Sequence, residues 1–205
     1  MKGIKVVIAV MVSGMMLGAA LPHNAGYKVG DDAMDFELKN VNGKMVSMSD
    51  FPSAKGFIVI FDCNTCPYSK AYNSRIIALS RKYMPLNFPL IAINANDPSI
   101  STGDSFEEMV KVAAEKGYDF PYLVDATQEV AKTYGATNTP HVFVLQKAAG
   151  HLKVAYVGTI DDNARKPSGV TRRYVEDAVD ALLAGRPVPV TQTKALGCGI
   201  KWKGV

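Results

Sequence analysis

Cysteine and tryptophan are scarce in this chain, which has three cysteines and one tryptophan among 205 residues. A strong charge excess is missing too, because the formal net charge is +4 and two of those charges lie in the first five residues. Without a basic stripe there is no nucleic-acid footprint, so nucleic acid is not expected as a partner. The sequence also lacks internal repeats and low-complexity tracts. After residue 20, no apolar run is long enough to cross a membrane.

The segment over residues 1–20 has the pattern of a secretory signal peptide. Two lysines precede an uncharged apolar run from Val6 to Ala20, which ends in the small residues that signal peptidase needs. A retained membrane anchor is the alternative, but the run has only about 15 residues and a spanning helix needs roughly 20. We therefore expect cleavage near Ala20 or Ala25, and export to the periplasm or another extracytoplasmic compartment.

Apolar runs alternate with helical patterns along the rest of the chain. The run "GFIVIF" suits a central strand that is covered on both faces, and "NG" at 42–43 is a turn signal between two short strands. Apolar residues recur at helical spacing after Pro67. The predicted strands cover 35–40, 45–51, 56–61, 88–94, 121–125, 141–146 and 152–158, and the predicted helices cover 67–84, 105–117, 127–135 and 170–185.

This order of elements predicts an α/β fold. Strands that alternate with helices and end in an antiparallel pair form a mixed central sheet with helices on both faces, and the fold begins with an N-terminal hairpin. We assign residues 21–185 to this single domain. The C-terminal tail, residues 186–205, contains Pro187 and Pro189 and is expected to be extended.

The stretch "FDCNTCPYSK" places two cysteines where the central strand gives way to a helix. We expect Cys63 at or just before the helix N-terminus, where free N–H groups and the helix dipole favour a thiolate. Cys66 is then one turn inward, and a spacing of three residues brings the sulfurs within disulfide reach. This is the arrangement that a dithiol oxidoreductase requires. In that chemistry Cys63 attacks a substrate disulfide and Cys66 resolves the mixed disulfide. The carboxylate of Asp62 would oppose the thiolate if it lies close.

Other interpretations of the cysteines stay open. The pair could form a structural disulfide, which would persist after export. A zinc site wants four ligands and no such set has ligand spacing, so no metal is expected, although Cys63, Cys66 and His141 could hold a soft cation such as copper. Cys198 is a candidate third redox thiol that could pair with an active-site sulfur, or a buried bystander. Its two flanking glycines would let the tail backbone pack closely.

Longer strings carry a family resemblance. Thr139-Pro140 precedes the last two predicted strands, and the chain contains "CNTCPYSKAY", "INANDP", "KGYDFPYLVDATQEVAKTYGATNTP", "GTIDD" and "GCGIKW". From about Gly26 to Gly185 the chain resembles thioredoxin-fold proteins of the alkyl hydroperoxide reductase/thiol-specific antioxidant group, often called peroxiredoxin-like. The resemblance implies that Pro140 is cis and shapes a substrate groove beside the CxxC motif. It also implies that Thr139 offers backbone atoms to an extended substrate. No cofactor is expected.

The chain departs from true peroxiredoxins at two points. Cys66-Pro67 is similar to their peroxidatic Cys-Pro, but their signature is Pro-x-x-x-Thr-x-x-Cys. Here Cys63 stands at the threonine position and Val59 at the proline position. That family also uses an arginine from a later strand to polarise the peroxide, whereas this chain has no arginine between Arg81 and Arg165. An arginine from 165–173 would have to reach the site instead.

The sequence therefore predicts an exported thiol-disulfide oxidoreductase that uses the CxxC dithiol. Its expected partners are protein or small-molecule disulfide or dithiol substrates and an unidentified thiol that donates or accepts electrons. Two alternatives stay open: a thiol peroxidase with antioxidant activity that uses Cys66, and a copper-binding carrier with a thioredoxin fold. Fold alone does not decide among them.

Overall fold

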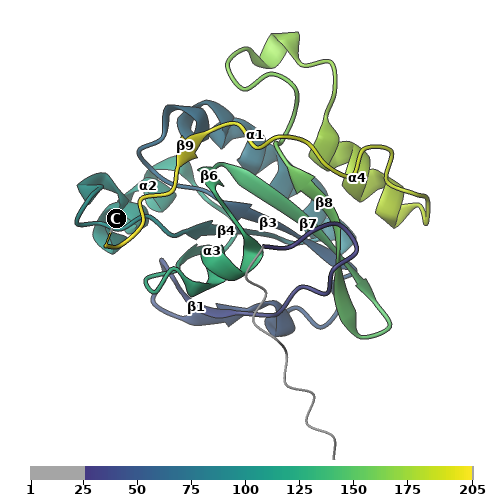
Figure 1. Ribbon diagram of the computed structural model, residues 1–205, viewed down its shortest axis with the longest axis horizontal. Helices are drawn as coiled ribbons and strands as arrows, with labels where there is room; N and C mark the ends of the chain where they lie inside the picture. The colour runs from purple at the N-terminus through teal and green to yellow at the C-terminus, as the bar shows by residue number, and fades with distance from the viewer. Residues whose placement is uncertain (1–25, 205) are drawn as a thin grey trace, which may run out of the picture.

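A seven-stranded mixed sheet forms the centre of the computed structural model, which describes residues 26–204 (Figure 1). The predicted signal peptide and both predicted cleavage sites lie outside the described residues. Within residues 26–204, no helix combines the length and the apolar character that a membrane span requires. The strand order is β2-β1-β5-β4-β3-β7-β8. The strands are Glu37–Asn40 (β1), Met45–Ser47 (β2), Gly56–Phe61 (β3), Leu90–Asn94 (β4), Tyr122–Val124 (β5), His141–Ala148 (β7) and His151–Gly158 (β8).

Strand β3 lies at the middle of this sheet and every one of its residues is buried. It pairs in parallel with β4 and antiparallel with β7. Since successive strand residues point to opposite faces, Ile58 and Ile60 enter one hydrophobic cluster while Phe57, Val59 and Phe61 enter the other. This double burial is why the segment reads as an unbroken apolar run.

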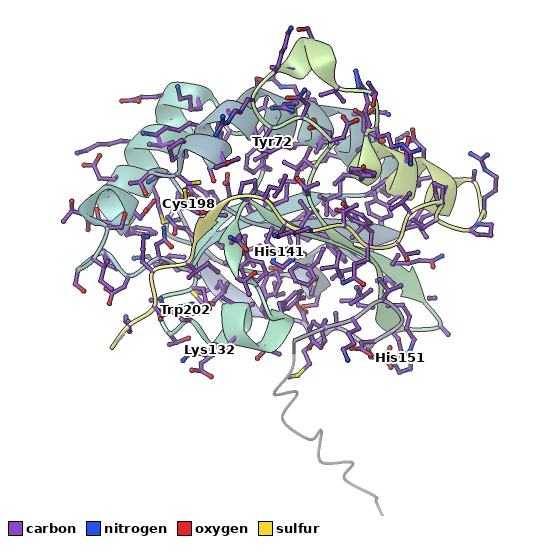
Figure 2. The ribbon with its side chains drawn as sticks, turned by 45° about the horizontal axis from the view of Figure 1, so that its top comes forward. Tyr72, Lys132, His141, His151, Cys198 and Trp202 are labelled. Carbon is purple, nitrogen blue, oxygen red and sulfur yellow. The ribbon has the colours of Figure 1, made fainter. Side chains whose placement is uncertain are left out.

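Helices cover both faces of the sheet, as expected. Three helices bury side chains in the first cluster and the short α3 buries side chains in the second. Tyr72, labelled in Figure 2, is fully buried in the first cluster. The helices are Pro67–Tyr83 (α1), Phe106–Lys116 (α2), Glu129–Tyr134 (α3) and Tyr174–Leu183 (α4). The expected α/β arrangement, a thioredoxin-like fold that begins with a hairpin, is therefore confirmed.

Some predicted boundaries were wrong. Strand β2 ends at Ser47, because Asp50 accepts a hydrogen bond from the Ser47 amide and a 3-10 helix follows over Met48–Asp50. The last helix begins at Tyr174 and not at residue 170.

The C-terminal tail contains more structure than the sequence predicted. It contains a two-residue strand, Cys198–Gly199 (β9), which pairs with Asn138–Thr139 (β6). The tail also exchanges backbone hydrogen bonds with Val157 of β8 through Thr191 and Thr193. It is thus packed on the domain along much of its length.

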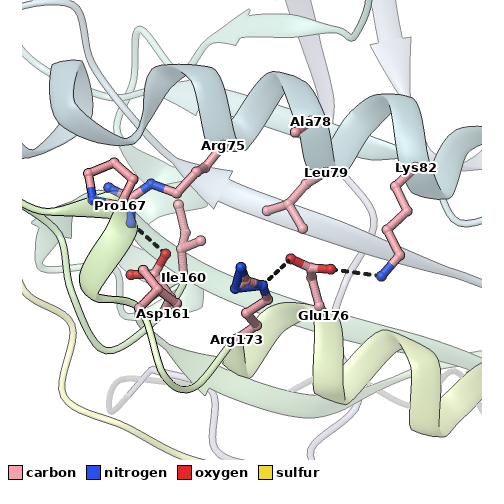
Figure 3. Close-up of a pocket in the computed structure, with 10 residues that line it drawn as sticks. Arg75, Ala78, Leu79, Lys82, Ile160, Asp161, Pro167, Arg173 and Glu176 are labelled. Carbon is pink, nitrogen blue, oxygen red and sulfur yellow. Dashed lines mark hydrogen bonds and ion pairs between the residues drawn. The ribbon is translucent and has the colours of Figure 1, made fainter.

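Arg75 of α1 ties the loop after β8 to the helix layer. Its guanidinium donates to the Asp161 carboxylate at 2.5 Å and to the carbonyl oxygens of Asn163 and Ala164 at 2.9 and 2.6 Å. Asp161 is almost fully buried. The ion pair borders a pocket of about 290 Å³ between α1 and α4 (Figure 3). The buried ion pair therefore holds α1 and the loop after β8 together, although the two segments are more than 80 residues apart in the sequence.

Replacing Arg75 with leucine is expected to lower the free energy of unfolding by about 3–5 kcal/mol, because Asp161 would remain buried without its cation. Arg81→Leu is the matched control, since Arg81 also lies on α1 and pairs with an aspartate at 3.0 Å, but in solvent. The control should lose less than about 1 kcal/mol. Urea unfolding at pH 7 measures both values, and equal losses would contradict this account of Arg75.

Candidate active site

The CxxC motif lies in the loop that joins β3 to α1. Helix α1 begins at Pro67, and Cys66 is its N-cap residue in an extended conformation. Proline is favoured at this first helical position, because an N–H group there would have no partner within the helix and proline lacks that group. Cys63 therefore precedes the helix by four residues, and the prediction that it sits at the helix start with Cys66 one turn inward is wrong. Both side chains are buried, with exposed fractions of 5% and 2%.

Thr139 contacts both sulfurs. Its hydroxyl lies 3.1 Å from the Cys63 Sγ, and its carbonyl oxygen lies 3.1 Å from the Cys66 Sγ, which donates to it. The Thr139–Pro140 peptide bond is cis, so Pro140 has the geometry that the family resemblance implied. Sequence reasoning thus singled out four residues that the structure brings to one place, although Thr139 and the cysteines are more than 70 residues apart.

The two thiols are coupled by a hydrogen bond between them. When Cys63 keeps the proton, its hydrogen bond lowers the pKa of Cys66 to about 4, and the backbone of Ser69 acts in the same direction against the effect of burial. The same hydrogen bond, burial and the nearby Asp104 raise the pKa of Cys63. In the alternative arrangement the Cys66 thiol donates to Thr139 and the Thr139 hydroxyl donates to Cys63. The site therefore supports either sulfur as the thiolate, and the pair titrates as a unit.

Asp62 is a buried carboxylate directly before the motif. Burial raises its pKa from 3.8 to about 6, a hydrogen bond with Ser69 opposes that rise, and the negative charge on Cys66 adds to it. Its Oδ1 atom is buried and has no hydrogen-bond partner. The sequence identified Asp62 as a neighbour of the thiolate, and the structure confirms that it lies close to Cys63.

Asp104 holds the two residues between the cysteines, and the sequence analysis missed it. Its carboxylate accepts hydrogen bonds from the Asn64 amide and the Thr65 hydroxyl, both at 2.7 Å, and from the Ser101 hydroxyl at 2.6 Å. Asn96 donates a fourth at 2.9 Å. Although burial opposes ionisation, these donors lower the pKa of Asp104. No spacing in the sequence links Asp104 to the motif. Of its partners, only Asn96 lies in a string that the sequence analysis quoted, "INANDP".

Cys63 borders a cavity of about 570 Å³ between α1 and α2. Lys70 and Asn73 of α1 and Lys116 of α2 are among its lining residues. No arginine is among the described residues that line it. Arg173, from the segment that could have supplied one, pairs instead with Glu176 at the α1–α4 pocket (Figure 3). The cavity gives a route to Cys63 but does not contain the cation that peroxiredoxins use.

His141 does not join the cysteines as a ligand. It is the first residue of β7 (Figure 2), its Nδ1 accepts a hydrogen bond from the Thr137 amide at 3.3 Å, and its ring packs 4.8 Å from that of Phe143. Burial lowers its pKa to about 4. Over the part of the chain that the structure describes, no three His, Cys, Asp or Glu side chains are grouped to hold a metal ion. The Cys63, Cys66 and His141 set proposed for copper is therefore not assembled here.

Sequence comparison places the chain in a known family. The profile of the AhpC/TSA family matches residues 29–157, which include Cys63, Cys66 and Thr139-Pro140. The chain belongs to the AhpC/TSA family. The family match ends before Cys198.

Two solved structures resemble this member of the AhpC/TSA family over most of its length. An uncharacterized conserved protein from Geobacillus kaustophilus is 41% identical, with a TM-score of 0.79 and coverage of 87% of this chain and 94% of that one. A hypothetical protein from Sinorhizobium meliloti 1021 is 31% identical, with a TM-score of 0.80 and coverage of 88% and 97%. Among curated proteins, the thiol-disulfide oxidoreductase ResA of Geobacillus thermodenitrificans is 24% identical over 134 residues, 64% of this chain and 71% of that protein.

Asp62→Asn is expected to change how stability depends on pH. Because the folded-state pKa of Asp62 is raised from 3.8 to about 6, its contribution is fully present below pH 3.8 and is lost as pH rises through 6. Between pH 4 and pH 7, the stability of the wild type relative to the variant should fall by about 2–3 kcal/mol. Urea unfolding of the reduced proteins at both pH values measures this difference.

The control for this experiment is Asp177→Asn, since Asp177 is an exposed aspartate on α4. Its effect on the free energy of unfolding should stay within about 0.5 kcal/mol at both pH values. If the difference between wild type and Asp62→Asn were the same at pH 4 and pH 7, the assignment of a raised pKa to Asp62 would be wrong.

Proposed function

We propose that this protein is an exported thiol-disulfide oxidoreductase in which Cys63 and Cys66 form the redox-active dithiol. The observation that carries the proposal is the contact of Thr139 with both buried sulfurs, from its hydroxyl to Cys63 and from its carbonyl oxygen to Cys66, each at 3.1 Å. The name of the ResA relative, a thiol-disulfide oxidoreductase, supports the same chemistry. The signal-peptide pattern over residues 1–20 supports export.

The attack on a substrate disulfide is assigned to Cys63, because Cys63 borders the open cavity and the tail lies over Cys66. As a substrate sulfur approaches, the Cys63 proton passes to Cys66. The Cys63 thiolate then bonds to one substrate sulfur, and the other substrate sulfur leaves as a thiolate that takes a proton from water. This step gives a mixed disulfide between Cys63 and the substrate.

Cys66 resolves the mixed disulfide in the second step. Its proton passes to the unpartnered oxygen of Asp62, whose pKa of about 6 suits a transient proton acceptor near neutral pH. The Cys66 thiolate bonds to the Cys63 sulfur, and the first substrate sulfur leaves as a thiolate that takes the proton held by Asp62. The protein now holds a Cys63–Cys66 disulfide and the substrate has gained two electrons. The same steps in reverse oxidise a dithiol substrate.

Peroxide reduction at Cys66 is the second candidate function. It is favoured by membership of the AhpC/TSA family, by Pro67 at the helix start and by the lowered pKa of Cys66. Against it, Cys63 takes the place of the peroxiredoxin threonine and no arginine is among the described residues that line the cavity. Oriented donors that stabilise a leaving group are typically worth about 10²–10³ in rate each.

The roles of the two cysteines can be separated by trapping. Cys66→Ser should accumulate a mixed disulfide between Cys63 and a protein substrate, because the resolving sulfur is missing. Cys63→Ser should not, because the remaining sulfur is covered by the tail. Non-reducing electrophoresis followed by mass spectrometry identifies the trapped species. The opposite pattern would show that Cys66 is the attacking thiol.

The two candidate functions differ in their preferred oxidant. The reduced wild-type protein should reduce the disulfides of insulin far faster than it reduces hydrogen peroxide, whose rate should stay near that of an unassisted thiolate. Insulin turbidity and stopped-flow loss of thiol measure the two rates. A peroxide rate more than about 10²-fold above that of a free thiol, abolished by Cys66→Ser, would establish the peroxidase instead.

A further inference from the structure

The C-terminal tail occupies the edge of β6 beside the active-site cysteines. Strands β9 and β6 pair antiparallel, with Cys198 opposite Thr139 and Gly199 opposite Asn138. Figure 1 shows β9 beside β6 and close to the end of α1. An extended substrate that uses the backbone of Thr139 would need this same edge, because strand addition satisfies unpaired backbone groups at an edge. The tail therefore lies where the family resemblance places the substrate.

Gly197 fits closely against the active-site loop. A Cβ atom at this position would lie 2.1 Å from the Thr139 carbonyl oxygen and 3.1 Å from the Pro140 nitrogen. A Cβ atom at Gly199, two residues later in the same segment, would meet nothing within 4 Å. The close approach is thus specific to Gly197, the residue before Cys198, and it brings the tail backbone into direct contact with Thr139.

The backbone amide of Cys198 contacts the sulfur of Cys66. The Cys198 amide donates to the Cys66 Sγ at 3.4 Å, and the nearby Cys66 sulfur adds to burial in raising the pKa of the Cys198 thiol. Cys198 is only half-buried, whereas Cys63 and Cys66 are fully buried. The contacts of the Cys63 Sγ are with Ser69, Thr139 and Cys66. Cys198 is therefore placed to exchange with Cys66 in particular.

We propose that Cys198 is a third redox residue, and that the tail segment 197–199 is a built-in substrate of the CxxC disulfide. This inference rests on the proposed dithiol chemistry of Cys63 and Cys66. The Cys198 thiolate attacks the Cys66 sulfur of a Cys63–Cys66 disulfide, so the Cys66–Cys198 bond forms and the Cys63–Cys66 bond breaks. Cys63 leaves as a thiolate and takes the proton that Cys198 released. No electrons enter or leave, because one disulfide replaces another.

The exchange has two consequences for the site. The disulfide between the two buried residues Cys63 and Cys66 is replaced by one between Cys66 and the half-buried Cys198. Cys63 becomes a free thiol beside the open cavity. The exchange also fixes the tail on the edge of β6, so an external extended substrate has to displace the tail before it can pair with Thr139. The tail and the external substrate therefore compete for one strand edge.

Disulfide mapping of the full-length protein tests this proposal. The reduced protein is oxidised with one equivalent of diamide, free thiols are alkylated, and disulfide-linked peptides are quantified by mass spectrometry. The Cys63→Ser variant should give the Cys66–Cys198 disulfide as its main intramolecular product. The Cys66→Ser variant should give little Cys63–Cys198 product, because those two sulfurs are not in contact. Wild type should give both Cys63–Cys66 and Cys66–Cys198.

Two glycine variants test whether the tail must sit on Thr139. In the Cys63→Ser background, Gly197→Ala should lower the initial rate of Cys66–Cys198 formation at least about fivefold, because the new methyl group overlaps the Thr139 backbone. Gly199→Ala is the matched control and should stay within about twofold, because its methyl group points into open space. Equal rates in the two variants would overturn the proposed docking of the tail.

The outcomes separate this inference from the proposed function. If Cys63→Ser forms no Cys66–Cys198 disulfide while wild type forms Cys63–Cys66 and reduces insulin, the third redox residue is refuted and the dithiol function stands. If wild type forms no Cys63–Cys66 disulfide and reduces no insulin, the proposed function itself fails.

Discussion

The contact between Thr139 and the CxxC sulfurs is the constraint on which the rest of the site depends. The hydroxyl of Thr139 meets Cys63, its carbonyl meets Cys66, and its backbone pairs with the tail strand at Cys198. One residue thus provides a donor, an acceptor and a strand edge. Because β7 pairs directly with β3 from His141 onward, the sheet holds Thr139 against the loop that follows β3. The arrangement of the two cysteines around Thr139 is a consequence of strand pairing at the centre of the fold.

The two carboxylates near the thiols, Asp104 and Asp62, differ in their hydrogen bonding. Asp104 is satisfied by several donors and stays ionised, so it fixes the loop between the cysteines as a structural anion. Asp62 is buried with one oxygen unpartnered, and its pKa is raised toward neutrality. A buried carboxylate in that state is costly to stability, which is the usual sign of a group that has a functional role. The two carboxylates flank the same motif, yet only Asp62 is suited to carry a proton.

Family membership and site chemistry point in partly different directions. The AhpC/TSA match covers the cysteines and Thr139, and Cys66-Pro67 is similar to the peroxidatic Cys-Pro of peroxiredoxins. The CxxC spacing suits disulfide exchange instead, as does a cavity whose described lining residues include no arginine. The tail adds a further difference, since it lies beyond the matched residues and brings a third cysteine to Cys66. Function in this protein is therefore set by details of the site that the shared fold does not specify.

The sequence by itself determined the fold, because its apolar patterns are local signals. The run at 56–61 required a strand buried on both faces, and the spacing after Pro67 required a helix with one apolar face. The positions of Cys63, Cys66 and Thr139-Pro140 were enough to predict a redox site. The helix start at Pro67 was predicted, but the expectation that Cys63 sits at the helix start and Cys66 one turn inward was wrong, because both cysteines lie in the loop before the helix.

Only the tertiary structure decided how the site works. The anchoring of the motif by Asp104 and the docking of Cys198 on Cys66 join segments about 40 and 130 residues apart, and no periodicity relates them. The pKa values of Asp62 and of the thiol pair depend on burial and on neighbours in three dimensions. Local sequence specifies local structure, whereas one threonine in contact with two sulfurs and a strand edge filled by the tail exist only after the chain has folded.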